Sequence, residues 1–329
     1  MGSQVAGKRE FMGVAMSRIG RAALLVVRLA LAFATMMGAY MVSTTAMSGT
    51  SVTLTPEEAN QAATALASFS VISALVLSYL IIRSPWRGWR LIVAMLLVQF
   101  GVETLMSQME TLYFNSALQL GTPELIGLVA AGALRASMFV PLAVLIFGKM
   151  KRSGPPREQR VATAMLQWGK RVAALAVLWV LVYFMFGYFV AWQWEETRLF
   201  YTGTATIKPF FTHFRDLFIR EDPFIVPFQV LRGVLWAALA TLIVRIIESE
   251  WWEASLAVAA TFAVLLALPL GLFPNPYMPP AVARSHFVET ASSMLLYGGI
   301  AGWALQGGKV RSEVDRSDAG GRRGAPAGR

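Results

Sequence analysis

The sequence predicts an all-α fold: a polytopic integral membrane bundle of about eight transmembrane helices, with both termini cytoplasmic. Three observations support this. Of the 329 residues, 56% are hydrophobic and only 15% are charged, with a mean hydropathy of +0.55, an apolar excess beyond that of ordinary soluble domains. The apolar residues fall into blocks of about twenty, the length that crosses a ~30 Å hydrocarbon layer as a helix. Lysine and arginine are also shared unequally between the breaks that separate these blocks.

Eight apolar blocks can be drawn along the chain. Thr55-Pro56-Glu57-Glu58 marks the start of the second helix, because it offers a cap hydroxyl, a proline at the first helical position and a glutamate three residues after the cap. Polar residues interrupt the third block, and Glu289, Ser292 and Ser293 interrupt the eighth, so these two carry the weakest signal. The blocks are residues 22–42, 62–82, 91–111, 125–148, 172–192, 224–247, 254–273 and 287–306.

The orientation follows from the basic residues. With the N-terminus in the cytoplasm, 21 of the 29 Lys and Arg residues lie on the inner side, five lie on the outer side, and Arg28, Arg135 and Arg232 lie within blocks. This is the bias of the positive-inside rule. Eight of the ten tryptophans lie near the end of a block, as expected for an aromatic belt at the membrane interfaces. We therefore expect a multi-pass protein of the plasma (inner) membrane.

The chain divides into five parts. Faint similarities between the two halves, such as Met36-Met37-Gly38 and Met185-Phe186-Gly187, leave open whether four helices are repeated in parallel. The expected parts are a cytoplasmic N-terminal segment (1–21), helices one to four (22–148), a basic cytoplasmic linker (149–171), helices five to eight (172–306) and a disordered, basic cytoplasmic tail (307–329).

One long outer segment, residues 193–223, carries an amphipathic pattern. Phe210, Phe211, Phe214, Leu217 and Phe218 recur at i, i+1, i+4, i+7 and i+8, which places them on one side of a short interfacial helix. The pattern fits a helix that lies on the outer leaflet or plugs the bundle. It fits equally well a segment that is packed on its own helices.

Two charges are expected to pair within the membrane. At ~1.5 Å per residue, Glu103 lies about 18 Å from the inner face in the third helix, and Arg135 lies about 15 Å from that face in the fourth. A charge at mid-bilayer costs roughly 2.5 to 3.5 kcal/mol and needs a partner. We therefore predict an intramembrane ion pair between Glu103 and Arg135.

A second polar group is expected in the outer half of the bundle. Arg232, His286 and Glu289 lie at similar depths, and His286 and Glu289 share a helix face at i, i+3. Arg198 and His213 belong to the outer segment between the fifth and sixth helices. We take these five residues as the candidate substrate-binding residues and expect Arg232, His286 and Glu289 to converge.

Several kinds of chemistry are excluded. The chain has no cysteine, which removes disulfides, thiolate metal sites and cysteine nucleophiles. Its net charge of +10 is mostly cytoplasmic loop charge, so no nucleic-acid partner is expected. His213, His286 and Glu289 have the composition of a hydrolytic zinc site, but no spacing links His213 to the other two. We therefore expect no metal and no cofactor.

The function that fits best is transport or binding of a small or lipid-like ligand, possibly anionic, in a polar cavity of the outer half. The lipid bilayer is the expected partner, and the sequence does not indicate the oligomeric state. One alternative is a structural or assembly role without a substrate. The other is a membrane-embedded enzyme that uses His213, His286 and Glu289 at the outer face. The sequence favours a non-enzymatic role and identifies no catalytic residue.

Overall fold

The computed structural model describes residues 2–47, 55–151, 165–274 and 278–321, and every regular element in these ranges is helical. Within this part of the chain, seven helices are long and apolar enough to cross a membrane, which confirms the helical membrane bundle. They are Ile19–Ala46, Ala59–Arg83, Gly88–Tyr113, Thr122–Ile146, Gln167–Gln193, Ile225–Ile246 and Trp251–Leu272.

The eighth expected span lies in α13 (Pro280–Gly321), a helix that is not among these seven. Glu289 and the serine and glycine residues that follow it lower the hydropathy of this stretch. The count of eight crossings therefore stays a prediction. The backbone of α13 is also helical over residues 307–321, where the composition led us to expect a disordered tail. Residues 322–329 lie outside the described ranges.

The first half of the chain contains α1 (Gly2–Met47), α2 (Pro56–Arg83) and α6 (Thr122–Ile146). The third crossing helix is composite: α3 (Gly88–Phe100) continues through a π-helical turn, η1 (Gly101–Leu105), into α4 (Met106–Tyr113). A short α5 (Asn115–Leu118) follows. The start of α2 at Pro56 confirms the helix start expected there.

The second half begins with α7 (Met165–Phe189), and its outer segment contains η2 (Ala191–Gln193), α8 (Glu195–Thr202), α9 (Phe210–Asp216) and η3 (Leu217–Glu221). The chain then returns through α10 (Ile225–Ile246). The next crossing helix is again composite, with α11 (Trp251–Phe262), a π-helical turn η4 (Ala263–Ala267) and α12 (Leu268–Leu272). The short helix expected in this segment is thus present as α9 and η3.

The two halves share one contact pattern. In the first half α1 contacts α2 and α6, and α3 contacts α6; in the second half α7 contacts α10 and α13, and α11 contacts α13. Between the halves α3 contacts α10, α2 contacts α11, and the two π-helical turns η1 and η4 contact each other. The turns occupy equivalent places, after 13 residues of α3 and 12 residues of α11. The halves therefore resemble each other in their contacts, and a parallel repeat of four helices stays a hypothesis.

Glycines allow the close helix contacts of the second half. A Cβ atom at Gly298 would lie 2.7 Å from Cα of Ala259, and one at Gly302 would lie 2.6 Å from the carbonyl oxygen of Ala254. Both neighbours are backbone atoms of α11, so α13 packs directly on the backbone of that helix. Small residues serve this purpose in membrane helices, where van der Waals packing contributes much of the association energy.

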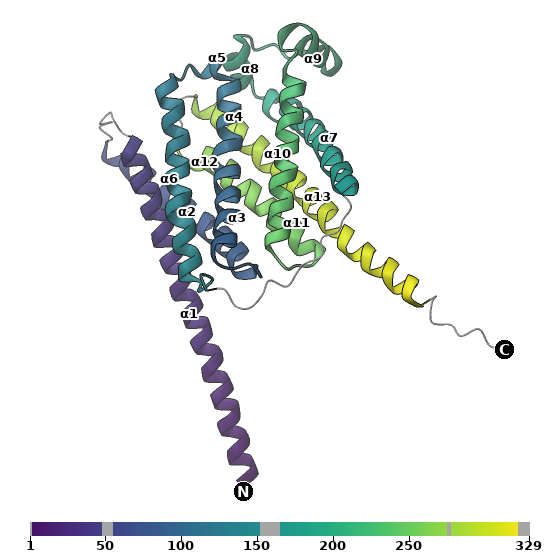
Figure 1. Ribbon diagram of the computed structural model, residues 1–329. Coiled ribbons are helices and arrows are strands. Elements are labelled where there is room, and N and C mark those ends of the chain that lie inside the picture. The colour runs from purple at the N-terminus through teal and green to yellow at the C-terminus, as the bar shows by residue number, and fades with distance from the viewer. Residues whose placement is uncertain (1, 48–54, 152–164, 275–277, 322–329) are drawn as a thin grey trace, which may run out of the picture.

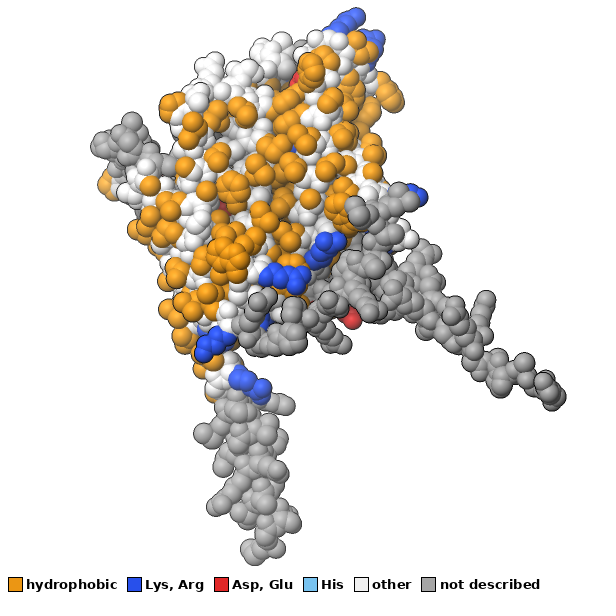
Figure 2. All heavy atoms as spheres, viewed as in Figure 1, with side chains coloured by type: hydrophobic (Ala, Val, Ile, Leu, Met, Phe, Trp, Pro, Cys, Tyr) orange, Lys and Arg blue, Asp and Glu red, His pale blue; other side chains and the backbone are white. Residues whose placement is uncertain are grey.

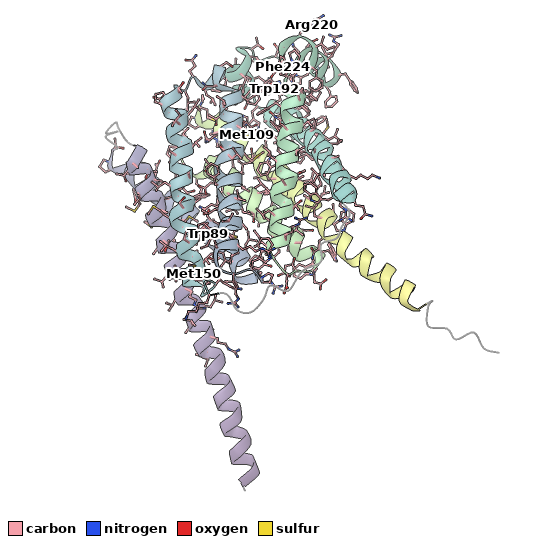
Figure 3. All side chains as sticks on the ribbon, viewed as in Figure 1. Trp89, Met109, Met150, Trp192, Arg220 and Phe224 are labelled. Carbon is pink, nitrogen blue, oxygen red and sulfur yellow. The ribbon has the colours of Figure 1, made fainter. Side chains whose placement is uncertain are left out.

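The surface of the bundle matches a membrane environment. Figure 2 shows hydrophobic side chains covering its side, with Lys and Arg side chains gathered near the ends. Large apolar side chains such as Leu97, Leu181 and Leu256 are more than half exposed on this surface. In Figure 1 the first part of α1 and the last part of α13 both extend from the lower end. Figure 3 places Trp89 and Met150 at that end, and Trp192, Arg220 and Phe224 at the opposite end.

Candidate functional site

The structure brings Glu103 and Arg135 together inside the bundle. Nε of Arg135 lies 2.9 Å from Oε1 of Glu103, and the side chains are only 15% and 5% exposed. Glu103 lies in the π-helical turn η1, and Arg135 lies on α6 one turn after Gly132. A Cβ atom at Gly132 would collide with the side chain of Thr104, so the absence of a side chain there lets η1 approach α6. The contact is an ion pair rather than an aligned hydrogen bond, because Nε of Arg135 lacks a hydrogen-bond partner.

Further side chains enclose this pair. The hydroxyl of Tyr40 donates a hydrogen bond to Oε1 of Glu103, and Nε2 of Gln99 donates one to Oε2 at 3.3 Å. Cζ of Arg135 lies 4.4 Å from the centre of the Tyr40 ring, within the range of a cation–π interaction. Both carboxylate oxygens of Glu103 thus have partners from α1, α3 or α6, and the pair ties these helices together.

Arg232 on α10 pairs with a residue that the sequence did not indicate as its partner. Its Nη2 atom lies 2.8 Å from Oε2 of Glu110 on α4. We expected Arg232 to converge with His286 and Glu289, but the ion pairs of the described residues join Glu289 to His286 and Arg232 to Glu110. Glu110 follows Glu103 by seven residues, so it lies about 10 Å further along the same composite helix. Counting residues along the helices could not distinguish between two carboxylates expected at a similar level.

The environment of Arg232 is apolar and incompletely satisfied. The arginine is 1% exposed, whereas the side chain of Glu110 is 37% exposed. The guanidinium carbon lies 5.5 Å from the ring centre of Trp179 and 5.8 Å from that of Phe228. Nη1 donates to Oε1 of Gln229 at 3.3 Å, but Nε of Arg232 has no acceptor among the described residues. This guanidinium is therefore a buried cation whose ion-pair partner is partly exposed.

His286 lies between two partners that come from different elements. Its Nδ1 atom is 3.4 Å from Oε2 of Glu289 on α13, and its Nε2 atom is 3.0 Å from the hydroxyl oxygen of Tyr201 on α8. Sequence analysis missed Tyr201, because no spacing relates α8 to α13. Burial, and then the negative charges of Glu110 and Glu289, raise the pKa of the Tyr201 hydroxyl. Tyr201 therefore lies within the electrostatic reach of both carboxylates.

Two of the five candidate substrate-binding residues lie outside this cluster. Arg198 is buried, but its guanidinium donates to the carbonyl oxygens of Ala205 at 2.7 Å and Trp192 at 2.6 Å, so it holds the outer segment in shape. His213 on α9 packs against the rings of Tyr188 and Trp192. Its burial lowers its pKa, which keeps the imidazole neutral at pH 7. Neither residue contacts Arg232, His286 or Glu289 in the described part of the chain.

The phenylalanines of the outer segment pack mainly on α7. Phe214 and Phe218 contact Phe184 with ring centres 5.5 Å and 4.9 Å apart, whereas Phe211 is 85% exposed. This geometry corresponds to a segment packed on its own helices. Beside these rings lies a groove of about 330 Å³ whose lining is entirely apolar. It is formed by α7, α9, η3 and the start of α10, and it differs in character from the polar cavity that we expected.

No group of three His, Cys, Asp or Glu side chains that could hold a metal ion occurs among the described residues. His213, His286 and Glu289, the set considered for zinc, therefore do not form such a group. Comparison with known proteins adds no constraint on the chemistry: no family model, no curated protein and no solved structure matches the chain. The arrangement around Arg232 has to be interpreted from its own geometry.

Proposed function

We propose that this polytopic membrane protein binds an anionic small or lipid-like molecule, with Arg232 as the anion-binding group. The supporting observation is the contrast between its two buried arginine pairs. Glu103 is enclosed and accepts hydrogen bonds from Tyr40 and Gln99 in addition to its contact with Arg135. Glu110 is more than one-third exposed, and its only described ion pair is the one with Arg232. The Glu103–Arg135 pair suits a structural role. The Glu110–Arg232 pair suits a site at which an anionic ligand replaces the carboxylate.

In this proposal an incoming anion replaces Glu110 at the guanidinium. Arg232 presents planar donors suited to a carboxylate, phosphate or sulfonate, and its unpaired Nε offers a further donor. A buried guanidinium is costly in a membrane protein unless a partner is present at all times. Glu110 fills that role in the free protein, and its exposed side gives it room to turn away when the ligand binds.

A hydrophobic tail on the ligand is supported by the apolar groove. The helices α7 and α10 that carry the groove-lining residues Phe184 and Val226 also carry Trp179 and Arg232. Both features lie on these helices toward the end that bears the outer segment, where Figure 3 shows Trp192 and Phe224. An amphiphile with one anionic headgroup would use the chemistry of both surfaces. Transport would add a second step, in which the bound ligand is released on the other side of the membrane.

The topology that we propose has eight crossings, with both termini on the cytoplasmic side of a plasma membrane. Its support is the excess of Lys and Arg on the inner segments. The place of α13 adds to this, because α13 contacts α7 and α11 as α6 contacts α1 and α3. Under this topology the Arg232–Glu110 pair lies in the outer half and is reached from outside.

The test uses decyl sulfonate as an anionic probe and decanol as its neutral counterpart, with the protein in phosphatidylcholine nanodiscs. We expect the sulfonate to bind to the wild-type protein and the alcohol to bind far more weakly. Glu110→Gln removes the competing carboxylate. Since hydrogen bonds to charged groups are worth about 1.5 to 3 kcal/mol, this variant should bind roughly 10- to 100-fold more tightly.

The loss-of-function variant combines Arg232→Met with Glu110→Gln, so that no unpaired charge is left to destabilise the fold. It should remain folded and lose sulfonate binding. Arg215→Met on α9 is the matched control, because Arg215 is 60% exposed and, among the described residues, its ion pair is with its neighbour Asp216. Equal sulfonate binding by the double variant and the wild type would refute Arg232 as the anion site and favour the structural role.

A further inference from the structure

Three titratable side chains form a hydrogen-bonded chain beside the proposed anion site. Glu289 contacts Nδ1 of His286 at 3.4 Å, and Nε2 of His286 contacts the hydroxyl oxygen of Tyr201 at 3.0 Å. The side chains of His286 and Glu289 are 23% and 12% exposed, so the chain is largely shielded from water. A carboxylate that orients one ring nitrogen leaves the other ring nitrogen to exchange a proton with the hydroxyl group.

At its Tyr201 end, this hydrogen-bonded chain lies near the segment that carries Glu110. The ring of Tyr201 packs against Phe114, which follows Glu110 by four residues, with ring centres 6.2 Å apart. The charges of Glu110 and Glu289 both act on the Tyr201 hydroxyl. Tyr201 thus contacts the imidazole of His286 directly and is close enough to Glu110 for the charge of that carboxylate to act on it.

Displacement of Glu110 creates an electrostatic problem that a proton would solve. Once an anion occupies Arg232, the carboxylate of Glu110 has lost its cation, and Glu289 adds a second negative charge nearby. Like charges that lie close together favour the uptake of a proton, and the largely buried pair of His286 and Glu289 is less solvated than Glu110. Histidine is the side chain whose ordinary pKa lets it bind that proton near neutral pH, and the chain has only two histidines.

We propose that Tyr201, His286 and Glu289 form a proton-binding site, and that one proton is taken up for each anion bound at Arg232. This inference rests on the proposed function. The proton comes from water on the outer side and adds to Nε2 of His286, or it passes through the Tyr201 hydroxyl to the displaced carboxylate of Glu110. In the relay, the Tyr201 hydroxyl gives up one proton and accepts another, so it is regenerated, and no other covalent bond changes. The charge of a monoanion is balanced by that of the proton, so the net charge of the site is unchanged.

The groups that surround this chain are known from the structure. Tyr183 of α7 interacts electrostatically with Tyr201 and Glu289 of this cluster, and also with Glu110 of α4 and Arg232 of α10. On α13 itself, Arg284 lies two residues before His286 and is exposed. Arg232 is the one buried cation in this set, and under the proposal its charge is compensated in both states, first by Glu110 and then by the ligand.

The experiment measures the dissociation constant of decyl sulfonate at about pH 6, 7 and 8 in phosphatidylcholine nanodiscs. The sulfonate headgroup remains ionised throughout, so any pH dependence comes from the protein. Uptake of one proton per anion makes the wild-type affinity fall by up to about tenfold per pH unit as the pH rises. A pH indicator in weakly buffered solution should report proton uptake when the sulfonate is added.

Two variants and one control test whether Tyr201 and His286 cause the pH dependence of sulfonate binding. His286→Gln should abolish the pH dependence and leave a similar affinity at all three values. Tyr201→Phe preserves the ring packing but interrupts the hydrogen-bonded chain, so it should reduce the pH dependence. His213→Gln is the matched control, because it removes the other histidine, which packs on α7 and η2, and it should retain the full wild-type pH dependence.

The outcomes separate this inference from the proposed function. If sulfonate binding depends on Arg232 but is independent of pH, the anion site stands and proton coupling is refuted. The same conclusion holds if His286→Gln keeps the wild-type pH dependence. If the sulfonate does not bind to the wild-type protein at any pH, the anion site itself is refuted, and the proton coupling with it.

Discussion

Substituting Glu103 alone and substituting Arg135 alone should lower the stability of the bundle by different amounts. In Glu103→Gln, the guanidinium of Arg135 loses its negative partner and keeps only neutral ones, the amide oxygen of the new side chain and the face of the Tyr40 ring. Removing one partner of a buried ion pair costs about 3 to 5 kcal/mol, because the remaining charge is not compensated. A cation–π contact offsets only about 0.5 to 2 kcal/mol of such a penalty. Glu103→Gln is therefore expected to be the more damaging single substitution.

Arg135→Met leaves a better satisfied partner. The carboxyl group of Glu103 retains the hydrogen bonds from Tyr40 and from Gln99, and it can also become neutral by taking up a proton. We therefore expect a smaller loss of about 1 to 3 kcal/mol, typical of a buried polar group that is left partly unsatisfied.

The double variant should recover much of the loss. Glu103→Gln with Arg135→Met leaves a neutral amide that can still hydrogen-bond to Tyr40, in a space filled by an apolar side chain. Replacing a whole buried pair in this way is often close to neutral, so we expect a loss below about 2 kcal/mol. Unfolding in mixed micelles of a mild detergent and sodium dodecyl sulfate, followed by tryptophan fluorescence, measures the three variants.

The control is a pair at the end of the bundle. Arg83 and Glu253 lie 2.7 Å apart, but Arg83 is 44% exposed, so the corresponding substitutions should change the stability by only about 0 to 1 kcal/mol. Additive losses for Glu103→Gln and Arg135→Met would refute the pairing. A larger loss for Arg135→Met than for Glu103→Gln would refute the roles given to Tyr40 and Gln99.

Three further predictions follow from the topology, the helix packing and the partly buried His213. Because the chain has no cysteine, single introduced cysteines can be labelled from either side. We expect outside labelling at Ser48, Leu118 and Ile207 and inside labelling at Arg87 and Gly154, and one reversal would overturn the orientation. Gly298→Val should cost about 1 to 3 kcal/mol by overpacking against α11, whereas Gly299→Val, with nothing within 4 Å, should be tolerated; equal thermal stabilities would contradict this packing. Since burial lowers the pKa of His213 from 6.5, the folded state binds fewer protons than the unfolded state. Stability should therefore be full above pH 6.5 and fall as the pH drops below it, and His213→Phe should remove that part of the pH dependence in thermal melts.

The membrane fold could be predicted from the sequence because its signal is local. A block of about twenty apolar residues has one stable solution in a bilayer, a helix that satisfies its own backbone. The level of a residue along its helix is also local information, because it follows from counting residues. Counting residues along two consecutive antiparallel helices placed Glu103 and Arg135 at one level, and the structure brings them to 2.9 Å. The short connection between these helices limits which neighbours each residue can meet.

The partner of Arg232 could not be predicted by counting residues along the helices. Glu110 and Glu289 lie at similar depths on two different helices, and only the packing of α10 decides which of them faces the arginine. The contact of Tyr201 with His286 could not be predicted for a related reason. Tyr201 lies on α8, in a long outer segment, and no periodic pattern in the sequence indicates how that segment runs over the bundle. The sequence alone thus determined the class of fold and the depth of each charge. Only the tertiary structure decided which charges meet, because depth is set along one helix whereas pairing depends on how several helices turn toward one another.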